Sequence, residues 1–134
     1  MTVIKSITVP VQNESDVVGA RQVTRQGAIA QGFSLIDLTK IVTAASELAR
    51  NTVIYGKGGT LTLEMLEDGA RKGLRLTFED NGPGIANLEL ALTDGYTSGS
   101  GLGLGLSGAR RLSNEFKITS EPDKGCKVMI ARWK

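Results

Sequence analysis

The stretch LRLTFEDNGPG, residues 74–84, decides the fold of this chain. Leu74, Leu76 and Phe78 alternate with polar residues, which is the pattern of a strand with one buried face. By the same alternation Asp80 shares that face, so its carboxylate points toward the core side at the end of the strand. A charge in that position needs a partner, because burial of an unpaired charge is costly. An amine of a bound ligand would supply one.

A second interpretation of the same residues stays open. The sequence Asp80-Asn81-Gly82 is a common hairpin signal, and a solvated turn needs no ligand. The following Pro83-Gly84 weakens that interpretation, because no strand pattern resumes after it. We therefore expect a loop rather than a hairpin at the end of this strand.

The rest of the chain predicts helices and strands on both sides of this stretch. In chain order they are a strand over 2–9 ended by Pro10, helices over about 13–32 and 34–55, strands around 61–65 and 74–78, a short helical stretch at 88–92, a helix over about 104–115, and strands at about 116–121 and 126–133. Asp68-Gly69 and Lys72-Gly73 predict the turn between the central strands. This order predicts an α/β two-layer sandwich, with helices on one face of a mixed, mostly antiparallel sheet. No repeat or second core is visible, so we expect one domain over 1–134.

Composition excludes several classes of protein. With no histidine and a single cysteine, Cys126, the chain cannot build a Ser-His-Asp triad, the usual zinc sites, a His-Arg-Asp catalytic loop or an internal disulfide. The net charge is +2 and no basic run stands out, so we expect neither a nucleic-acid nor a membrane partner. No stretch approaches about 18 apolar residues and the N-terminus lacks the apolar run of a signal peptide. A cytoplasmic location is therefore expected.

Two polar residues of the second predicted helix are candidates for metal binding and proton transfer. Glu47 and Asn51 stand four residues apart, so they project from one face beside its apolar stripe. Asn51 offers a neutral oxygen of the kind that Mg²⁺ accepts, and Glu47 can take a proton from an attacking hydroxyl. A plain surface pair on an amphipathic helix remains the alternative.

A glycine-rich segment, GSGLGLGL at residues 99–106, opens a later predicted helix. Exposed N–H groups and the helix dipole make such a place an anion site, and glycine lets phosphates approach the backbone. A flexible linker is the alternative, weakened because leucines alternate with the glycines. The formal dinucleotide pattern at 103–108 is rejected because no strand directly precedes it. A phosphate-binding loop ending at Gly56-Lys57 is rejected because Asn51 stands where its first glycine belongs.

Taken in order, these three segments resemble the sequence boxes of the GHKL (Bergerat-fold) ATPases and kinases. Residues 47–51 are similar to the N-box, 79–84 to the G1 box and 99–105 to the G2 box, and the resemblance covers about residues 35–134. It implies ATP and Mg²⁺ as cofactors, with Glu47 as the catalytic base, Asn51 as the Mg²⁺ ligand, and residues 86–100 as a lid. The residues that it implies for nucleotide binding are Asn51, Asp80, Gly82, Gly84, Gly99, Gly101, Leu102, Gly103, Leu104, Gly105 and Cys126.

Within that superfamily, residues 43–51, 94–99 and 130–133 are most similar to the RsbT-like serine/threonine switch kinases of the anti-sigma regulatory factor family. The resemblance implies a kinase that phosphorylates STAS-domain antagonist or scaffold proteins of the stressosome. The resemblance also implies that such a kinase then switches partner and activates a PP2C-type phosphatase. Two alternatives stay open: an anti-sigma factor that sequesters a sigma subunit, and a nucleotide-dependent binding module without catalysis. Glu47 argues against the second, because binding alone needs no base.

One position departs from the family pattern. Many members place a threonine after the glycine of the final hairpin, near the adenine, whereas here Cys126 follows Gly125. A thiol is a weaker hydrogen-bond partner than a hydroxyl. The resemblance therefore implies a weaker hydrogen bond to the nucleotide at this position than a threonine would make.

Overall fold

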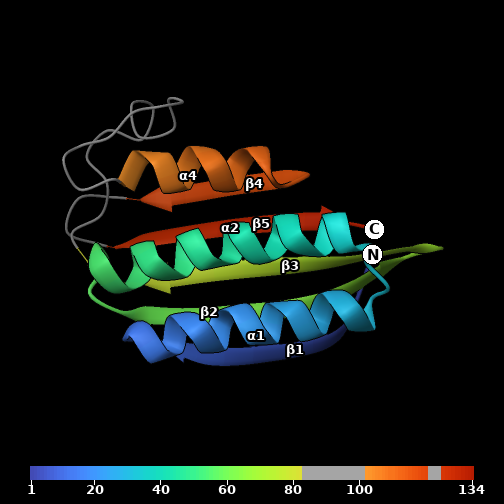
Figure 1. Cartoon of the computed structure of the whole chain (residues 1–134), viewed down its shortest axis with the longest axis horizontal. Helices are drawn as coiled ribbons and strands as arrows, with labels where there is room; N and C mark the ends of the chain where they lie inside the picture. The colour runs from blue at the N-terminus through green and yellow to red at the C-terminus, as the bar shows by residue number, and fades with distance from the viewer. Residues whose placement is uncertain (83–101, 121–124) are drawn as a thin grey trace.

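The computed structural model of the chain describes residues 1–82, 102–120 and 125–134. The elements in chain order are β1 (Thr2–Val11), α1 (Glu14–Ala30), α2 (Leu35–Ile54), β2 (Gly59–Asp68), β3 (Arg71–Asp80), α4 (Leu102–Arg111), β4 (Glu115–Ser120) and β5 (Cys126–Trp133). Figure 1 shows α1, α2 and α4 lying side by side over one face of the sheet. The predicted two-layer α/β sandwich is confirmed.

The sheet has five strands in the order β1-β2-β3-β5-β4, and every pairing among the described strands is antiparallel. The central strand, β3, is bonded on both sides, to β2 and to β5. Asp80 at its end stands opposite Gly59, the first residue of β2. The β2–β3 ladder at Asp80 and the β3–β5 ladder, which ends one residue earlier at Glu79, therefore fix the backbone that carries this carboxylate.

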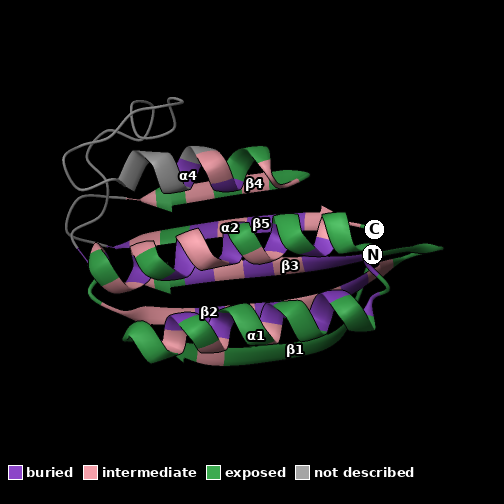
Figure 2. Cartoon of the chain, viewed as in Figure 1, coloured by how far each residue is buried: buried purple, intermediate pink, exposed green. Residues whose placement is uncertain are grey.

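The core lies between the helices and the sheet, and buried residues follow the inner sides of both layers (Figure 2). The stripe predicted for α2 is buried throughout, namely Leu38, Ile41, Ala45, Leu48 and Thr52. It packs in one cluster with the alternating leucines and phenylalanine of β2 and β3. Each fully buried aliphatic or aromatic side chain contributes about 1.5–3 kcal/mol relative to exposure. The apolar residues spaced at the helical period of 3.6 and those spaced at the strand period of two thus pack against one another in one core.

The helix starts that the sequence predicts are confirmed. Asn13 accepts a hydrogen bond from the backbone N–H of Asp16 at 3.0 Å, and Ser34 accepts one from the N–H of Asp37 at 3.2 Å. Each side chain satisfies one of the N–H groups that a helix leaves unpaired at its start. Gly32 follows α1 with φ 79°, a conformation that favours glycine.

Three boundaries differ from the sequence predictions. Pro10 does not end β1 but pairs with Thr60 inside it, which is tolerated because β1 is an edge strand. Lys72 and Gly73 belong to β3 rather than to the turn. The helix expected over 104–115 is α4, which begins at Leu102 and ends at Arg111. The helical stretch predicted at 88–92 lies outside the described residues. None of the described helices is long and apolar enough to cross a membrane.

Candidate functional site

An inner cavity lies where the last turns of α2 meet the ends of β3 and β5 and the first part of α4. Its volume is about 40 Å³, and three of the residues predicted for nucleotide binding line it together, Asn51, Asp80 and Cys126. Its other lining residues are Leu48, Thr52, Tyr55, Gly56, Phe78, Leu106 and Val128. Residues from distant parts of the sequence thus form a mainly apolar site with a few convergent polar groups, as is usual for ligand sites.

The carboxylate of Asp80 is held by the backbone. Its Oδ1 accepts hydrogen bonds from the N–H of Gly82 at 2.9 Å and from the N–H of Cys126 at 3.2 Å. The second bond crosses from β3 to β5. Its Oδ2 receives no hydrogen bond from any residue in the described part of the chain. Backbone N–H groups therefore hold one carboxylate oxygen in place, and the other oxygen is left to accept a hydrogen bond from a ligand.

Three glycines let the chain approach Asp80 closely. A Cβ atom on Gly56 would overlap the Asp80 carboxylate, and one on Gly82 would lie 2.8 Å from the backbone of Gly56. Gly125 has φ 83°, and a Cβ there would overlap the backbone carbonyl of Asp80. Gly82 was predicted from the sequence, whereas Gly56 was considered only as part of a phosphate-binding loop that the sequence does not support. Its contact with Asp80 had no signal in the sequence, because it depends on how α2 packs against β3.

Asn51 brings an unsatisfied amide to the cavity. Its Nδ2 is buried and has no hydrogen-bond partner among the described residues. Buried polar groups are nearly always paired, so an orphan of this kind calls for an explanation. A half-turn of the carboxamide presents its oxygen instead of its N–H₂ group, so the side chain can meet either a cation or an acceptor. A bound ligand in the cavity would satisfy it.

Glu47 lies one turn before Asn51 but does not line the inner cavity. Its side chain is 43% exposed, and its Oε1 lies 3.4 Å from Nη1 of Arg50. An exposed pair of this kind contributes little to stability. The predicted pair on one helix face is therefore divided, with Asn51 turned into the cavity and Glu47 turned to solvent.

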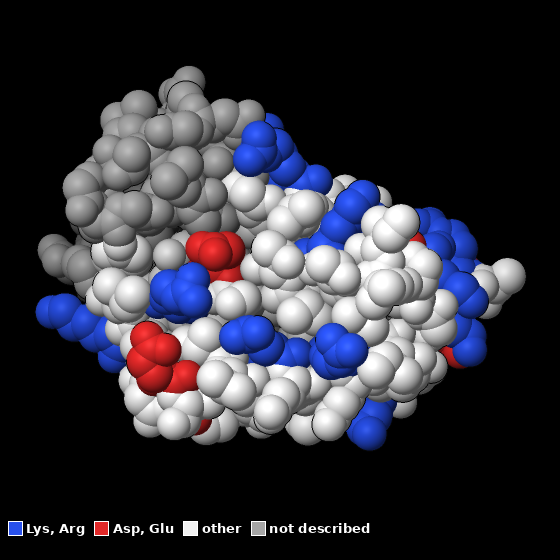
Figure 3. All heavy atoms as spheres, viewed as in Figure 1, with Lys and Arg blue, Asp and Glu red and all other residues white. Residues whose placement is uncertain are grey.

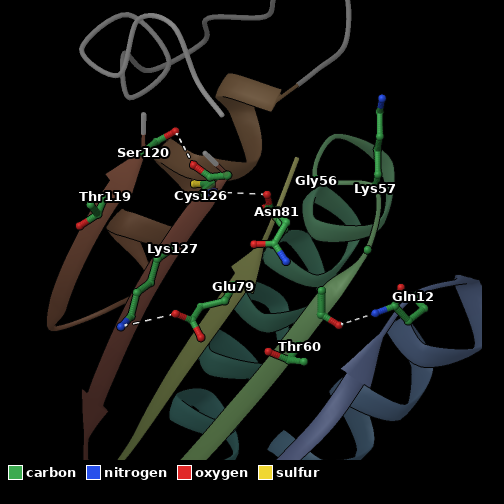
Figure 4. Close-up of a pocket in the computed structure, with 14 residues that line it drawn as sticks. Gln12, Gly56, Lys57, Thr60, Glu79, Asn81, Thr119, Ser120, Cys126 and Lys127 are labelled. Atoms are coloured by element: carbon green, nitrogen blue, oxygen red, sulfur yellow. Dashed lines mark hydrogen bonds and ion pairs between the residues drawn. The ribbon is translucent and has the colours of Figure 1, made fainter. Parts of the chain in front are cut away.

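A larger cleft of about 730 Å³ opens beside the inner cavity and shares Gly56, Asp80 and Cys126 with it. Figure 4 shows Glu79 and Lys127 pointing toward one another in this cleft, with 3.6 Å between their charged atoms. Its volume lies in the range of small-molecule sites, about 300–1,000 Å³. The inner cavity alone is close to the volume of a single water molecule, so the two together offer the room for a ligand.

Cys126 is a protonated thiol in this setting. Burial raises its pKa to about 11, and the negative charge of Asp80 acts in the same direction. The thiol therefore stays uncharged at neutral pH and is a poor nucleophile. Its backbone N–H, rather than its sulfur, makes the bond to Asp80.

The predicted phosphate-binding segment is described in part. Leu102, Gly103, Leu104 and Gly105 form the beginning of α4, and Leu106 is buried against the inner cavity. The first N–H groups of a helix have no partner within it and favour an anion. Gly84, Gly99 and Gly101 lie outside the described residues, as does the whole of the predicted lid, residues 86–100.

The donor set fits a nucleotide and a hard cation. Asp80 offers an acceptor for an amine, the start of α4 offers donors for phosphate, and Asn51 offers an amide oxygen. Among the described residues no cluster of three or more acids, cysteines or histidines could hold a metal by itself. Mg²⁺ is often bound through one or two protein oxygens together with substrate phosphates and waters, so a single amide ligand suits it.

Comparison with known proteins identifies the class. The chain belongs to the histidine kinase-, DNA gyrase B- and HSP90-like ATPase family, whose model matches residues 36–134. The resemblance to the GHKL superfamily is thereby confirmed, and ATP binding is the property that this family implies.

Individual relatives within that class can be named. The chain is 39% identical to "Serine/threonine-protein kinase RsbT" of Bacillus subtilis (strain 168) over 125 residues, which cover 93% of this chain and 94% of the relative. It is 33% identical to "Anti-sigma F factor" of Clostridium perfringens (strain 13 / Type A) over 129 residues, 89% of each. Its fold is similar to that of the RsbU and RsbW domains of Rv1364c from Mycobacterium tuberculosis, with a TM-score of 0.68 at 19% identity, covering 97% of this chain and 33% of that one.

Proposed function

We propose that this chain is a Mg-ATP-dependent serine/threonine protein kinase that phosphorylates a STAS-domain antagonist or scaffold protein and then switches partner to activate a PP2C-type phosphatase. The observation that carries the proposal is the cavity in which the open Oδ2 of Asp80 and the orphan amide of Asn51 meet. The similarity to RsbT over 93% of the chain supports the choice of a kinase.

Each residue has a role in this proposal. Asp80 accepts a hydrogen bond from the adenine amine, while Gly56 and Gly82 let the backbone pack closely beside it. Asn51 binds Mg²⁺, which would neutralise charge on the phosphates when bound. The N–H groups at the start of α4, residues 102–105, hold phosphate oxygens. The apolar walls of the inner cavity exclude water around the adenine ring.

Glu47 is the general base in the transfer step. It takes the proton of a serine or threonine hydroxyl on the acceptor, as the hydroxyl oxygen bonds to the γ-phosphorus. The bond between that phosphorus and the bridging oxygen breaks, and ADP leaves. The solvent exposure of Glu47 supports an acceptor that docks from outside, because a buried base could not reach the hydroxyl of another protein. The chain has no histidine, so no phosphohistidine forms on it.

A second candidate function has one observation in its favour. The 33% identity to "Anti-sigma F factor" over 89% of the chain is compatible with sequestration of a sigma subunit. The two functions differ in what the protein holds, a STAS-domain protein and a phosphatase in the first, a sigma factor in the second. Phosphate transfer to a STAS-domain protein supports the first and is the measurement that separates them.

The test is phosphorylation in a purified system. The chain is incubated with Mg-ATP and each STAS-domain protein of the same cell, and the partner is then analysed by intact-mass and peptide mass spectrometry. We expect an acid-stable phosphoserine or phosphothreonine on one partner, and its loss with Glu47→Ala while ATP binding persists. Fast ATP hydrolysis by the isolated chain, with no phosphate on any STAS-domain protein, would contradict the proposal. Stable capture of a sigma factor without transfer would support the second candidate.

A further inference from the structure

Three aliphatic side chains are exposed together at the connection between α1 and α2. Ile29 is 59% exposed, Leu35 is 74% exposed and Ile36 is 69% exposed, and all three fall within eight residues of sequence. A single exposed aliphatic residue is ordinary, because much of any protein surface is apolar. A cluster at one corner of the molecule is the less common observation. We call these three residues the hairpin patch.

The fold does not need the hairpin patch. The residues that close this end of the core are Phe33 and Leu38, which are 8% and 6% exposed. They flank the cap residue Ser34 in the positions of a hydrophobic staple. Leu35 and Ile36 then occupy the first two positions of α2, where polar or acidic residues usually serve a helix best. Nothing in the core or in the helix start accounts for two large aliphatic side chains there.

The support beneath the hairpin patch is rigid. Gln31 is 2% exposed, and its Nε2 donates to the carbonyl oxygens of Leu66 and Gly73, both at 2.9 Å. The turn itself is closed by a backbone bond from Phe33 to Ala28 at 3.0 Å. A surface that is already ordered loses little conformational entropy when a partner binds.

Cations surround the hairpin patch. Arg25 is one helical turn before Ile29, Lys40 is one turn after Ile36, and the Lys134 ammonium lies beside Gly32. None of these three cations makes an ion pair with a residue that the structure describes.

The one acid within residues 25–40, Asp37, interacts with Lys40 through its charge but offsets these cations only in part. Asp37 is bound by Arg132 at 2.7 Å, and this bond keeps the pKa of Asp37 below its usual value. Figure 3 looks onto the helices and shows both basic and acidic side chains over α1 and α2, but within residues 25–40 the two cations Arg25 and Lys40 stand against the single acid Asp37. The corner is therefore apolar at its centre and positive at its rim.

The hairpin patch is far from the nucleotide site. It lies at the first residues of α2, and Asn51 lies near the last turn of the same helix (Figure 1). A helix of 20 residues is about 30 Å long. A molecule bound at the hairpin patch can therefore be held without entering the inner cavity, and its contacts are independent of the proposed transfer step.

We propose that the hairpin patch and its basic rim are a docking surface for an acidic amphipathic helix of a partner protein. An apolar centre with a charged rim is the usual anatomy of an interface. The cations on α1 and α2 lie on opposite sides of the aliphatic residues along the chain, so acids on both flanks of one apolar stripe would meet them. The surface is formed by helix ends rather than by a strand edge, which favours a helix as the occupant.

The test compares two synthetic helical peptides on the unaltered protein. Both carry leucines at positions i, i+3, i+4 and i+7, and their flanking positions are all glutamate in one and all lysine in the other. Binding is measured by titration of ¹⁵N-labelled protein in NMR spectra. We expect the glutamate peptide to bind at least about 10-fold more tightly, with shifts concentrated in residues 25–40.

Two sets of variants sharpen the test. Leu35→Ser with Ile36→Ser removes apolar contact and should weaken the glutamate peptide about 10-fold or more. Val18→Ser is the matched control, because Val18 is a 47% exposed aliphatic residue of α1 outside the patch, and it should change nothing. Arg25→Glu with Lys40→Glu should reverse the preference between the two peptides. ATP binding should be unchanged in all of these variants, which also shows that they are folded.

Several outcomes would overturn the proposal. Equal affinity for both peptides, or shifts centred elsewhere on the protein, would show that no such surface exists. Sedimentation that reveals self-association of the chain, abolished by Leu35→Ser with Ile36→Ser, would assign the hairpin patch to a second copy. Binding to phosphatidylglycerol vesicles without binding to the glutamate peptide would assign it to a lipid surface.

Discussion

The two ends of α2 can be compared directly, because one helix carries both. At the first end Ser34 caps the helix, Arg132 holds Asp37, and Gln31 satisfies two carbonyls of the sheet beneath. At the second end the chain runs into glycines, Asn51 keeps a buried amide group without a partner, and the Asp80 carboxylate beside it has one open oxygen.

The difference separates the structural end of the helix from the functional end. Most polar groups at the first end are paired within the chain, although the Nε of Arg132 is buried there without a hydrogen-bond partner among the described residues. Polar groups at the second end are left for something that the chain does not itself supply. Changes at the first end should therefore alter stability, and changes at the second should alter binding and chemistry.

The largest expected effect is on chemistry alone. Glu47→Gln removes the proposed base and should lower phosphoryl transfer about 10²- to 10⁴-fold, the usual contribution of a positioned base. Stability should change by less than about 0.5 kcal/mol, because the ion pair that Glu47 makes among the described residues is with the exposed Arg50. Single-turnover kinetics and urea unfolding measure the two quantities. Glu67→Gln, at another exposed and ion-paired glutamate, is the matched control. Normal transfer by Glu47→Gln would remove the base assignment.

The next effect is on stability alone. Gln31→Ala leaves the carbonyl oxygens of Leu66 and Gly73 without their buried donor and should lower the free energy of unfolding by about 2–4 kcal/mol. Chemical denaturation measures this, with exposed Gln22→Ala as the control. ATP affinity of the folded variant should stay the same. A variant that unfolds normally would show that this end of α2 does not depend on the glutamine.

Asp80→Asn tests the open carboxylate oxygen. The N–H groups of Gly82 and Cys126 require an oxygen, so they fix the amide with its N–H₂ turned toward the ligand. A donor then faces the adenine amine, and ATP affinity should fall by about 1–3 kcal/mol, which is about 5- to 150-fold. Isothermal calorimetry with Mg-ATP measures it. Unchanged affinity would place the nucleotide elsewhere.

The smallest effect depends on pH. The guanidinium of Arg132 lowers the pKa of Asp37 from its usual 3.8. A lowered pKa contributes stability that is present above 3.8 and is lost as the pH falls through the folded-state value. Asp37→Asn should therefore reduce the free energy of unfolding by about 1–2 kcal/mol at pH 7.

The pH dependence of that difference is the check. Denaturation of both proteins at neutral pH and in acid should show the gap narrowing below pH 3.8. A gap of the same size at every pH would mean that Arg132 does not act through the charge of Asp37.

Local signals were enough to predict most of the fold. The caps Asn13 and Ser34 and the buried stripe of α2 follow from rules that act within a few residues. The side on which Asp80 points followed from strand alternation, and it does line the inner cavity. These features need no knowledge of the tertiary structure.

The remaining features depend on contacts between distant residues. Gly56 and Asp80 are 24 residues apart in the sequence. They lie so close that a Cβ on Gly56 would overlap Asp80, and this proximity depends on how α2 packs against β3. The bonds of Gln31 reach residues 35 and 42 positions away. The orientation of Glu47 away from the cavity depends on the neighbours of α2 and not on its own periodicity. None of these has a local pattern from which it could be predicted.

The two bonds of Gln31 also bear on how the β2–β3 hairpin chooses its alignment. Leu66 and Gly73, whose carbonyls they reach, are directly opposite one another in that hairpin. A slip by two residues would keep every leucine on its buried face, so the hydrophobic pattern alone does not oppose it. In the slipped hairpin those two carbonyls would no longer be neighbours, and one amide could not bond to both. Gln31 therefore distinguishes the native alignment from the misaligned states that the apolar pattern accepts.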